Sequence, residues 1–224
     1  MRRTTFTARF GLVSIAIAGI ALLAAPEAQS GSKTSVAEDP EGDAFINFNL
    51  DIDAQEAPDY LDLTGGEITL QGGIFIFKLT VAGPVPDEPF APQGRVIDWF
   101  IGIDTDPTTF PTGFPNPPLS AHPCEFNVVV FWDGTDFDAI LIDRRPSLVG
   151  EDAIVTRIPF NIDVNDENEG ELSASVSSRM LDKPRSFEWA VLTDLVPGDF
   201  GNFGFLPADA MPDDFTMPLT WPAE

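Results

Sequence analysis

The chain has 224 residues, enough for one domain with a substantial core, and 36 acidic against 12 basic side chains give a formal net charge of −24. Such a charge repels nucleic acids and anionic membrane surfaces, so we expect neither as a partner, and it attracts divalent cations. The single cysteine, Cys124, excludes an internal disulfide.

Residues 1–30 have the pattern of a secretory signal peptide. A basic start with three arginines is followed by an apolar stretch from Phe10 to Ala25 and then by small residues. The apolar stretch is shorter than the roughly 20 residues of a confident membrane span, so we expect no membrane insertion once this segment is removed. The sequence therefore predicts an exported protein that is secreted, periplasmic or held at the cell surface.

Residues 31–38 are expected to form a flexible polar leader, and residues 39–224 a single domain. Two apolar runs joined by Gly72-Gly73 predict a hairpin, and two runs joined by Asp133-Gly134 predict another. Further strands are expected at residues 45–48, 96–103, 153–158, 172–178 and 187–192.

The expected strands are short and separated by turn residues, with 21 prolines and 18 glycines in the chain. Both faces of the strand at residues 96–103 are expected to be covered, because apolar side chains lie on each. No segment after the signal shows sustained helical periodicity, and the region from Asp194 onward is expected to be an irregular tail. This pattern predicts an all-β fold, an antiparallel β-sandwich.

Paired aspartates stand beside several of these apolar runs. Asp39 and Asp43 belong to an Asp-Pro-Glu-Gly-Asp turn, while Asp104 and Asp106 follow the strand at residues 96–103. Residues two apart in an extended segment project to the same side, and calcium accepts six to eight oxygen ligands in irregular geometry. We therefore expect calcium at Asp104 and Asp106, joined by Asp39 or Asp43. The alternative is that these aspartates only cap turns.

Six short segments occur in an order that resembles one class of extracellular module. They are Asp39-Pro-Glu-Gly-Asp43, Pro58-Asp-Tyr-Leu-Asp62, the expected strand from Phe75 to Leu79, Trp99-Phe-Ile-Gly-Ile-Asp104-Thr-Asp106, Phe187-Glu-Trp189 and Asp209-Ala-Met-Pro-Asp213. The chain resembles the jelly-roll modules grouped with DOMON-like and family 9-type carbohydrate-binding domains, including the C-terminal binding module of glucodextranase. The resemblance implies a β-sandwich of jelly-roll type, a non-catalytic role, and calcium or a sugar as ligand.

Some DOMON domains bind haem, but the present chain offers few residues that could serve as axial ligands. Axial ligation would have to come from His122, Met180, Met211 or Met217, and His122 is the only histidine. We therefore expect no haem.

The expected function is a secreted, non-catalytic binding module, stabilised by calcium, for carbohydrate or another cell-surface ligand. Sugar binding needs exposed aromatic platforms, and the candidates are Trp132, Trp189, Trp221 and the Phe200, Phe203 and Phe205 group. Core packing is the alternative explanation for most of these aromatic residues.

Two other functions stay open at this stage. The protein could be a structural or assembly component of the cell surface or matrix, pairing through its sheet edges. It could instead be a glycoside-active enzyme that uses carboxylates such as Asp133, Asp136 and Asp138, or Glu125 and Glu188. The sequence contains no catalytic signature, so we expect that it is not an enzyme.

Overall fold

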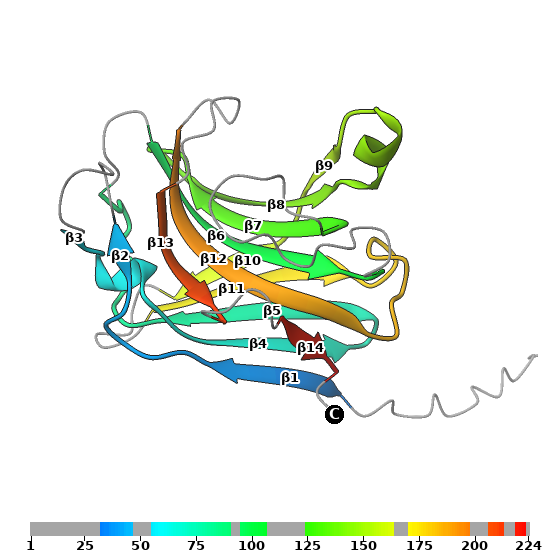
Figure 1. Cartoon of the computed structure of the whole chain (residues 1–224), viewed down its shortest axis with the longest axis horizontal. Helices are drawn as coiled ribbons and strands as arrows, with labels where there is room; N and C mark the ends of the chain where they lie inside the picture. The colour runs from blue at the N-terminus through cyan, green and yellow to red at the C-terminus, as the bar shows by residue number, and fades with distance from the viewer. Residues whose placement is uncertain are drawn as a thin grey trace, which may run out of the picture. The chain divides into compact units, whose positions relative to one another are not determined.

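The computed structural model describes residues 32–46, 55–90, 95–106, 124–163, 170–197, 206–212 and 218–222. These residues form two antiparallel sheets that pack against each other around one main core (Figure 1). The all-β antiparallel β-sandwich predicted from the sequence is confirmed. Within the described ranges, no helix has the length and hydropathy needed to cross a bilayer. The predicted signal peptide lies outside these ranges.

The first sheet has the strand order β1-β4-β5-β11-β10. Its members are β1 (Lys33–Glu38), β4 (Leu63–Gln71), β5 (Ile74–Val81), β11 (Gly170–Ser177) and β10 (Phe160–Asp163). The β4–β5 turn uses Gly72 and Gly73 at φ angles of 58° and 80°, where a side chain would be strained. The first predicted hairpin is therefore confirmed.

The second sheet has the order β13-β12-β6-β7-β8-β9, with β14 pairing to β12 beside this path. Its members are β6 (Arg95–Asp104), β7 (Phe126–Trp132), β8 (Phe137–Asp143), β9 (Ile154–Arg157), β12 (Phe187–Pro197), β13 (Leu206–Met211) and β14 (Leu219–Trp221). Asp133 Oδ1 accepts hydrogen bonds from the amides of Thr135 and Asp136 in the β7–β8 turn. This turn closes the second predicted hairpin.

Short elements connect the sheets. Strands β2 (Phe45–Ile46) and β3 (Gln55–Glu56) pair with each other, and two 3₁₀ turns, η1 (Asp59–Leu61) and η2 (Arg145–Val149), precede β4 and β9. The indole nitrogen of Trp99 donates to the Tyr60 carbonyl at 2.9 Å, and the Thr193 hydroxyl donates to the Leu61 carbonyl at 2.6 Å. These bonds fix η1 against β6 and β12.

Large aromatic side chains fill the space between the sheets. The largest fully buried ones include Trp99, Trp189, Trp221 and Phe75. The central strand β6 is buried on both faces: Trp99 and Ile101 enter the core, while Asp98 on the opposite face is only 4% exposed. The sequence prediction that both faces of this strand are covered is confirmed.

Two predictions about the ends of the domain were wrong. The supposed flexible leader contains β1, which pairs with β4 from Lys33 to Glu38. The supposed irregular tail contains β13 and β14, both paired to β12. Backbone pairing with strands far along the chain orders these segments. In β1 the polar Ser35 is buried and the apolar Val36 is exposed, so the strand lacks the alternation of buried apolar and exposed polar residues by which a half-buried strand is recognised.

Candidate metal centre

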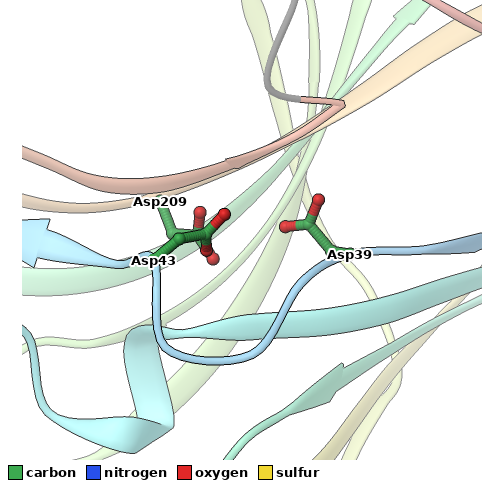
Figure 2. A group of neighbouring side chains, drawn as sticks. All are labelled: Asp39, Asp43 and Asp209. Atoms are coloured by element: carbon green, nitrogen blue, oxygen red, sulfur yellow. The ribbon is translucent and has the colours of Figure 1, made fainter.

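The Asp-Pro-Glu-Gly-Asp turn connects β1 to β2 and places one aspartate at each of its ends. Gly42 adopts a φ of 88°, and its amide donates to Asp62 Oδ2 at 2.7 Å. This bond ties the turn to the segment between η1 and β4. Asp39 and Asp43 are thereby brought to the same side of the turn, where they face a third aspartate (Figure 2).

The third aspartate is Asp209 of β13. One oxygen atom from each of Asp39, Asp43 and Asp209 lies within 4.8 Å of the other two. Asp209 is 8% exposed and held in place by backbone donors: the Leu63 amide donates to its Oδ2 at 2.5 Å and the Ala210 amide to its Oδ1 at 2.7 Å. The group thus joins residues more than 160 positions apart in the sequence.

Asp62 adds a further buried carboxyl group beside this group. It is 5% exposed, and its Oδ1 has no hydrogen-bond partner within the described part of the chain. Its charge contributes to the raised pKa of Asp209, so it lies within electrostatic reach. The Asp39–Asp43–Asp209 group therefore has a neighbouring carboxyl oxygen whose hydrogen-bonding capacity is not satisfied.

The pKa shifts reflect the concentration of negative charge. Burial, then the charges of Asp43 and Asp62, raise the pKa of Asp209 to about 6, against the hydrogen bonds from Leu63 and Ala210. Burial also raises the pKa of Asp62, with smaller contributions from Asp59 and Glu41. The neighbouring charges that act on these two groups are all carboxylates, so a bound cation would relieve their mutual repulsion.

Asp104 and Asp106 lie elsewhere. Asp104 pairs with Glu188 on β12, whereas Asp209 pairs with Thr193, five residues further along the same strand. At about 3.3 Å per residue, the two levels are about 17 Å apart. The structure brings together Asp39 and Asp43 as predicted. It places Asp104 and Asp106 at a second location, where the Asp106 amide donates to Asp104 Oδ1 at 3.0 Å.

Sequence reasoning missed Asp62 and Asp209 as members of this acidic group. Both occur in motifs that carry the family resemblance, and that resemblance was the only signal pointing to them. Neither belongs to a local pair of acids that periodicity or spacing would single out. Asp209 reaches the site only because β13 pairs with β12, an element that the sequence did not predict.

The candidate aromatic platforms that the structure describes are core residues. Trp132, Trp189 and Trp221 are 6%, 0% and 1% exposed, so core packing is confirmed for them. Phe200, Phe203 and Phe205 lie outside the described residues, as do the possible haem ligands His122 and Met217.

Other residues considered from sequence have structural partners. Asp133 bonds its own turn, and Asp138 forms an ion pair with Arg157 at 2.9 Å. Cys124 is fully buried, and burial raises the pKa of its thiol to about 12, although the Asn127 side-chain amide donates to its sulfur. A thiol held in its neutral form is a poor nucleophile and a poor metal ligand.

A hollow of about 410 Å³ lies beside β1 and β4. Its polar lining includes Glu38, Asp39, Glu67, Lys78 and Thr80. Asp39 belongs both to this hollow and to the Asp39–Asp43–Asp209 group. The surface hollow and the candidate metal centre are therefore adjacent.

Comparison with known proteins adds no relative to this picture: no protein-family model matches the chain, and no curated protein matches it.

Proposed function

We propose that this protein is an exported, non-catalytic binding module. Calcium holds the turn between β1 and β2 in place, and carbohydrate is the ligand class that the module binds. The observation that carries the proposal is the approach of Asp39, Asp43 and Asp209 to within 4.8 Å, next to the buried Asp62. A cation at this point would link β1, the β1–β2 turn and β13.

Calcium suits this group better than a softer metal. The candidate ligands are all carboxylate oxygens, and calcium accepts six to eight oxygens without strict geometry, so water and backbone carbonyls can complete its shell. Zinc sites use histidine and cysteine, and Cys124, two residues before β7, packs against Ala190 and Leu192 of the second sheet. The chemistry of the ligands therefore favours a hard cation.

The hollow beside β1 supports carbohydrate as the ligand class. Sugar hydroxyl groups donate to carboxylates and accept from an ammonium group, and the lining supplies both through Glu38, Glu67 and Lys78. Lys78 also pairs with Glu171 at 2.5 Å, which holds its ammonium group over the sheet surface. The signal-peptide pattern of residues 1–30 supports the exported location in this proposal.

Thermal unfolding tests the calcium proposal. The protein is first stripped with a chelator and then unfolded alone, with calcium and with magnesium. A ligand at 100 times its dissociation constant stabilises the folded state by about 2.7 kcal/mol, so calcium should raise the melting temperature clearly and magnesium should not. Asp43→Asn should make the calcium-induced rise smaller than in the wild type, while Asp152→Asn, which removes the same charge from an exposed loop, should leave it unchanged.

An unchanged melting temperature, or an equal rise with magnesium, would reduce the group to a solvated acidic turn. Carbohydrate binding is then tested on calcium-loaded protein with a glycan array, using Lys78→Ala to remove the hollow's ammonium group. If Lys78→Ala binds glycans as tightly as the wild type, the ligand does not bind in the hollow beside β1.

One observation favours assembly as a second candidate function. β9 is an edge strand of the second sheet, and Ile154 and Val155 on it are 55% and 58% exposed, with Val149 of η2 78% exposed nearby in sequence. An exposed apolar edge strand is a template for pairing with another chain. Sedimentation velocity over a range of concentrations tests this: a self-association that Val155→Lys removes would support assembly.

A further inference from the structure

A second group of carboxyl side chains lies where β6 ends, away from the Asp39–Asp43–Asp209 group. Asp104 is the last residue of β6 and pairs with Glu188 on β12. Glu125 immediately precedes Phe126, which pairs with Ile103, so it lies beside Asp104 on the other side. Three neighbouring strands thus bring three carboxyl groups to the same level of the sheet.

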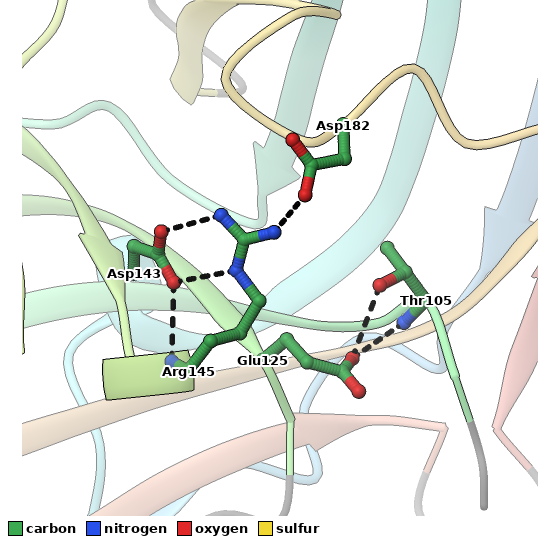
Figure 3. A network of polar contacts seen from close by, with 5 residues as sticks. All are labelled: Thr105, Glu125, Asp143, Arg145 and Asp182. Atoms are coloured by element: carbon green, nitrogen blue, oxygen red, sulfur yellow. Dashed lines mark hydrogen bonds and ion pairs between the residues drawn. The ribbon is translucent and has the colours of Figure 1, made fainter. Parts of the chain in front are cut away.

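The turn after β6 fixes one oxygen of each of two carboxyl groups. The Thr105 amide donates to Glu125 Oε2 at 2.7 Å, and the Thr105 hydroxyl donates to the same oxygen at 3.3 Å (Figure 3). The next amide, that of Asp106, donates to Asp104 Oδ1 at 3.0 Å. Two consecutive backbone amides therefore orient Glu125 and Asp104, whose side chains are also in hydrogen-bonding contact with each other.

Both of these carboxyl groups are removed from solvent. Asp104 is 3% exposed and Glu125 is 2% exposed. Glu125 Oε1 is buried and receives no hydrogen bond from any described group. Burial, followed by the charge and hydrogen bond of Glu125, raises the pKa of Asp104 to about 7, and Glu188 adds to this effect.

Two buried carboxyl groups in contact need a positive charge between them. Without one, their like charges and the lost hydration of both groups disfavour the ionised pair. A shared proton is one source of this charge. A divalent cation is another, and it would also satisfy the free coordination position of Glu125 Oε1. The half-buried Glu188 is the register partner of Asp104, and a change of its rotamer would bring its carboxylate to the same cation.

We propose that Asp104, Glu125 and Glu188 form a second divalent-cation site, with calcium as the expected ion. The site is independent of the Asp39–Asp43–Asp209 group, because about five residues of β12, or about 17 Å, separate their levels. The cation joins β12, β6 and β7 at their shared end. It also explains why three acids converge at one level of these neighbouring strands.

Direct calcium titration of the full-length protein tests the proposal, with isothermal titration calorimetry after chelator treatment. The wild type should bind two calcium ions per chain, Glu125→Gln and Asp43→Asn one each, and the double variant none. Asp152→Asn should bind two, since it removes a charge that belongs to neither site. One calcium ion in Asp43→Asn and none in the double variant would assign the second site even if wild-type affinities overlap.

The contrary results are equally distinct. A Glu125→Gln variant that binds as many ions as the wild type overturns the second site, and the Asp104–Glu125 pair then holds only a proton. A single ion that survives Asp43→Asn but is lost in Glu125→Gln leaves the second site intact and refutes the first.

Circular dichroism verifies that each variant is folded. If Glu125→Gln is not folded, Glu188→Gln replaces it, because Glu188 is only half buried. The Glu188→Gln variant should bind one of the two calcium ions at least tenfold more weakly and the other with unchanged affinity. Unchanged affinity for both ions would overturn the proposal.

Discussion

Asp98 on β6 and Asp194 on β12 are register partners whose side chains are hydrogen-bonded to each other. They are 4% and 1% exposed, so this pair of acids is buried on the outer face of the second sheet. Burial raises the pKa of Asp98 from its usual 3.8 to about 6, although the hydrogen bond with Asp194 opposes the shift. The folded protein therefore holds a proton here that the unfolded chain releases in weak acid.

We expect this pair to make stability depend on pH in the range from about 4 to about 6. Because the pKa of Asp98 is higher in the folded state, its stabilising contribution is full below the unfolded value of 3.8 and is lost as pH rises through about 6. Asp98→Asn should reduce the loss of stability between pH 4 and pH 7.5, because an amide does not ionise. Urea unfolding at both pH values, with chelator present, measures this.

The control for this experiment is Asp152→Asn, whose exposed carboxyl group should leave the pH dependence unchanged. An equal fall in stability for wild type and Asp98→Asn would mean that Asp98 does not carry the effect.

The aromatic group of Trp221, Phe187 and Phe75 should dominate the stability of the sandwich near β14. Trp221 stacks on Phe187 with ring centroids 5.1 Å apart and meets the edge of Phe75 at 4.8 Å. Trp221→Ala should cost about 3–5 kcal/mol of unfolding free energy, the usual range for a deleted core aromatic. Phe90→Ala is the control: Phe90 is 77% exposed and should change stability by less than about 0.5 kcal/mol. Chemical denaturation measures both, and similar losses would contradict this account.

Gly170 of β11 allows close packing that no larger residue can keep. An added Cβ would lie 2.6 Å from the Gly83 carbonyl oxygen, a backbone atom, and 2.7 Å from Val81. Gly170→Ala should therefore destabilise the fold by about 1–3 kcal/mol through overpacking. Ser173→Ala, three residues along the same strand on its half-buried face, should have a much smaller effect. A fully tolerated Gly170→Ala would show that β11 and the segment around Gly83 separate easily.

Arg145 of η2 joins two distant parts of the chain. Its Nε and Nη2 donate to the two oxygens of Asp143 at 2.8 and 2.6 Å, and Nη1 donates to Asp182 (Figure 3). Because lysine cannot reproduce this fork, Arg145→Lys should lose about 1 kcal/mol, measured by urea unfolding. Arg157→Lys is the matched control, since the Arg157 side chain is 84% exposed and makes a simple ion pair with Asp138. If Arg145→Lys and Arg157→Lys lose the same unfolding free energy, the forked pairing of Arg145 with Asp143 and Asp182 adds nothing beyond a surface ion pair.

The sequence was most informative where structure depends on neighbouring residues. Gly72-Gly73 and Asp133-Gly134 predicted their hairpins because the backbone angles of a tight turn are set by the residues in it. It was least informative for β1, β13 and β14, whose order comes from partners far along the chain. The same holds for the candidate metal centre. Asp39 and Asp43 could be grouped from sequence because they share one turn, whereas Asp209 is brought to them by the long-range pairing of β13 with β12.

The sequence analysis grouped Asp104 with Asp39, and the structure separates them. Whether the two carboxyl groups meet depends on the register of the strands in the sheet, and no local sequence pattern determines that register. A strand places its side chains according to where its neighbour begins, and a shift of five residues moves a carboxylate by about 17 Å. The same register brings Glu188 opposite Asp104. The sequence analysis had named Glu125 and Glu188 together, as possible catalytic carboxylates, but had not grouped them with Asp104.

The first and last strands of the sandwich meet each other. The Ser35 hydroxyl of β1 donates to the Thr220 carbonyl of β14 at 3.0 Å, across 185 positions of sequence, and the two strands belong to different sheets (Figure 1). β1 pairs along its length with β4, and this single bond adds a link from the edge of the first sheet to β14 of the second. Because contacts of such long sequence separation carry a large loop-closure cost, we expect the β1–β14 contact to be among the last to form as the sandwich folds.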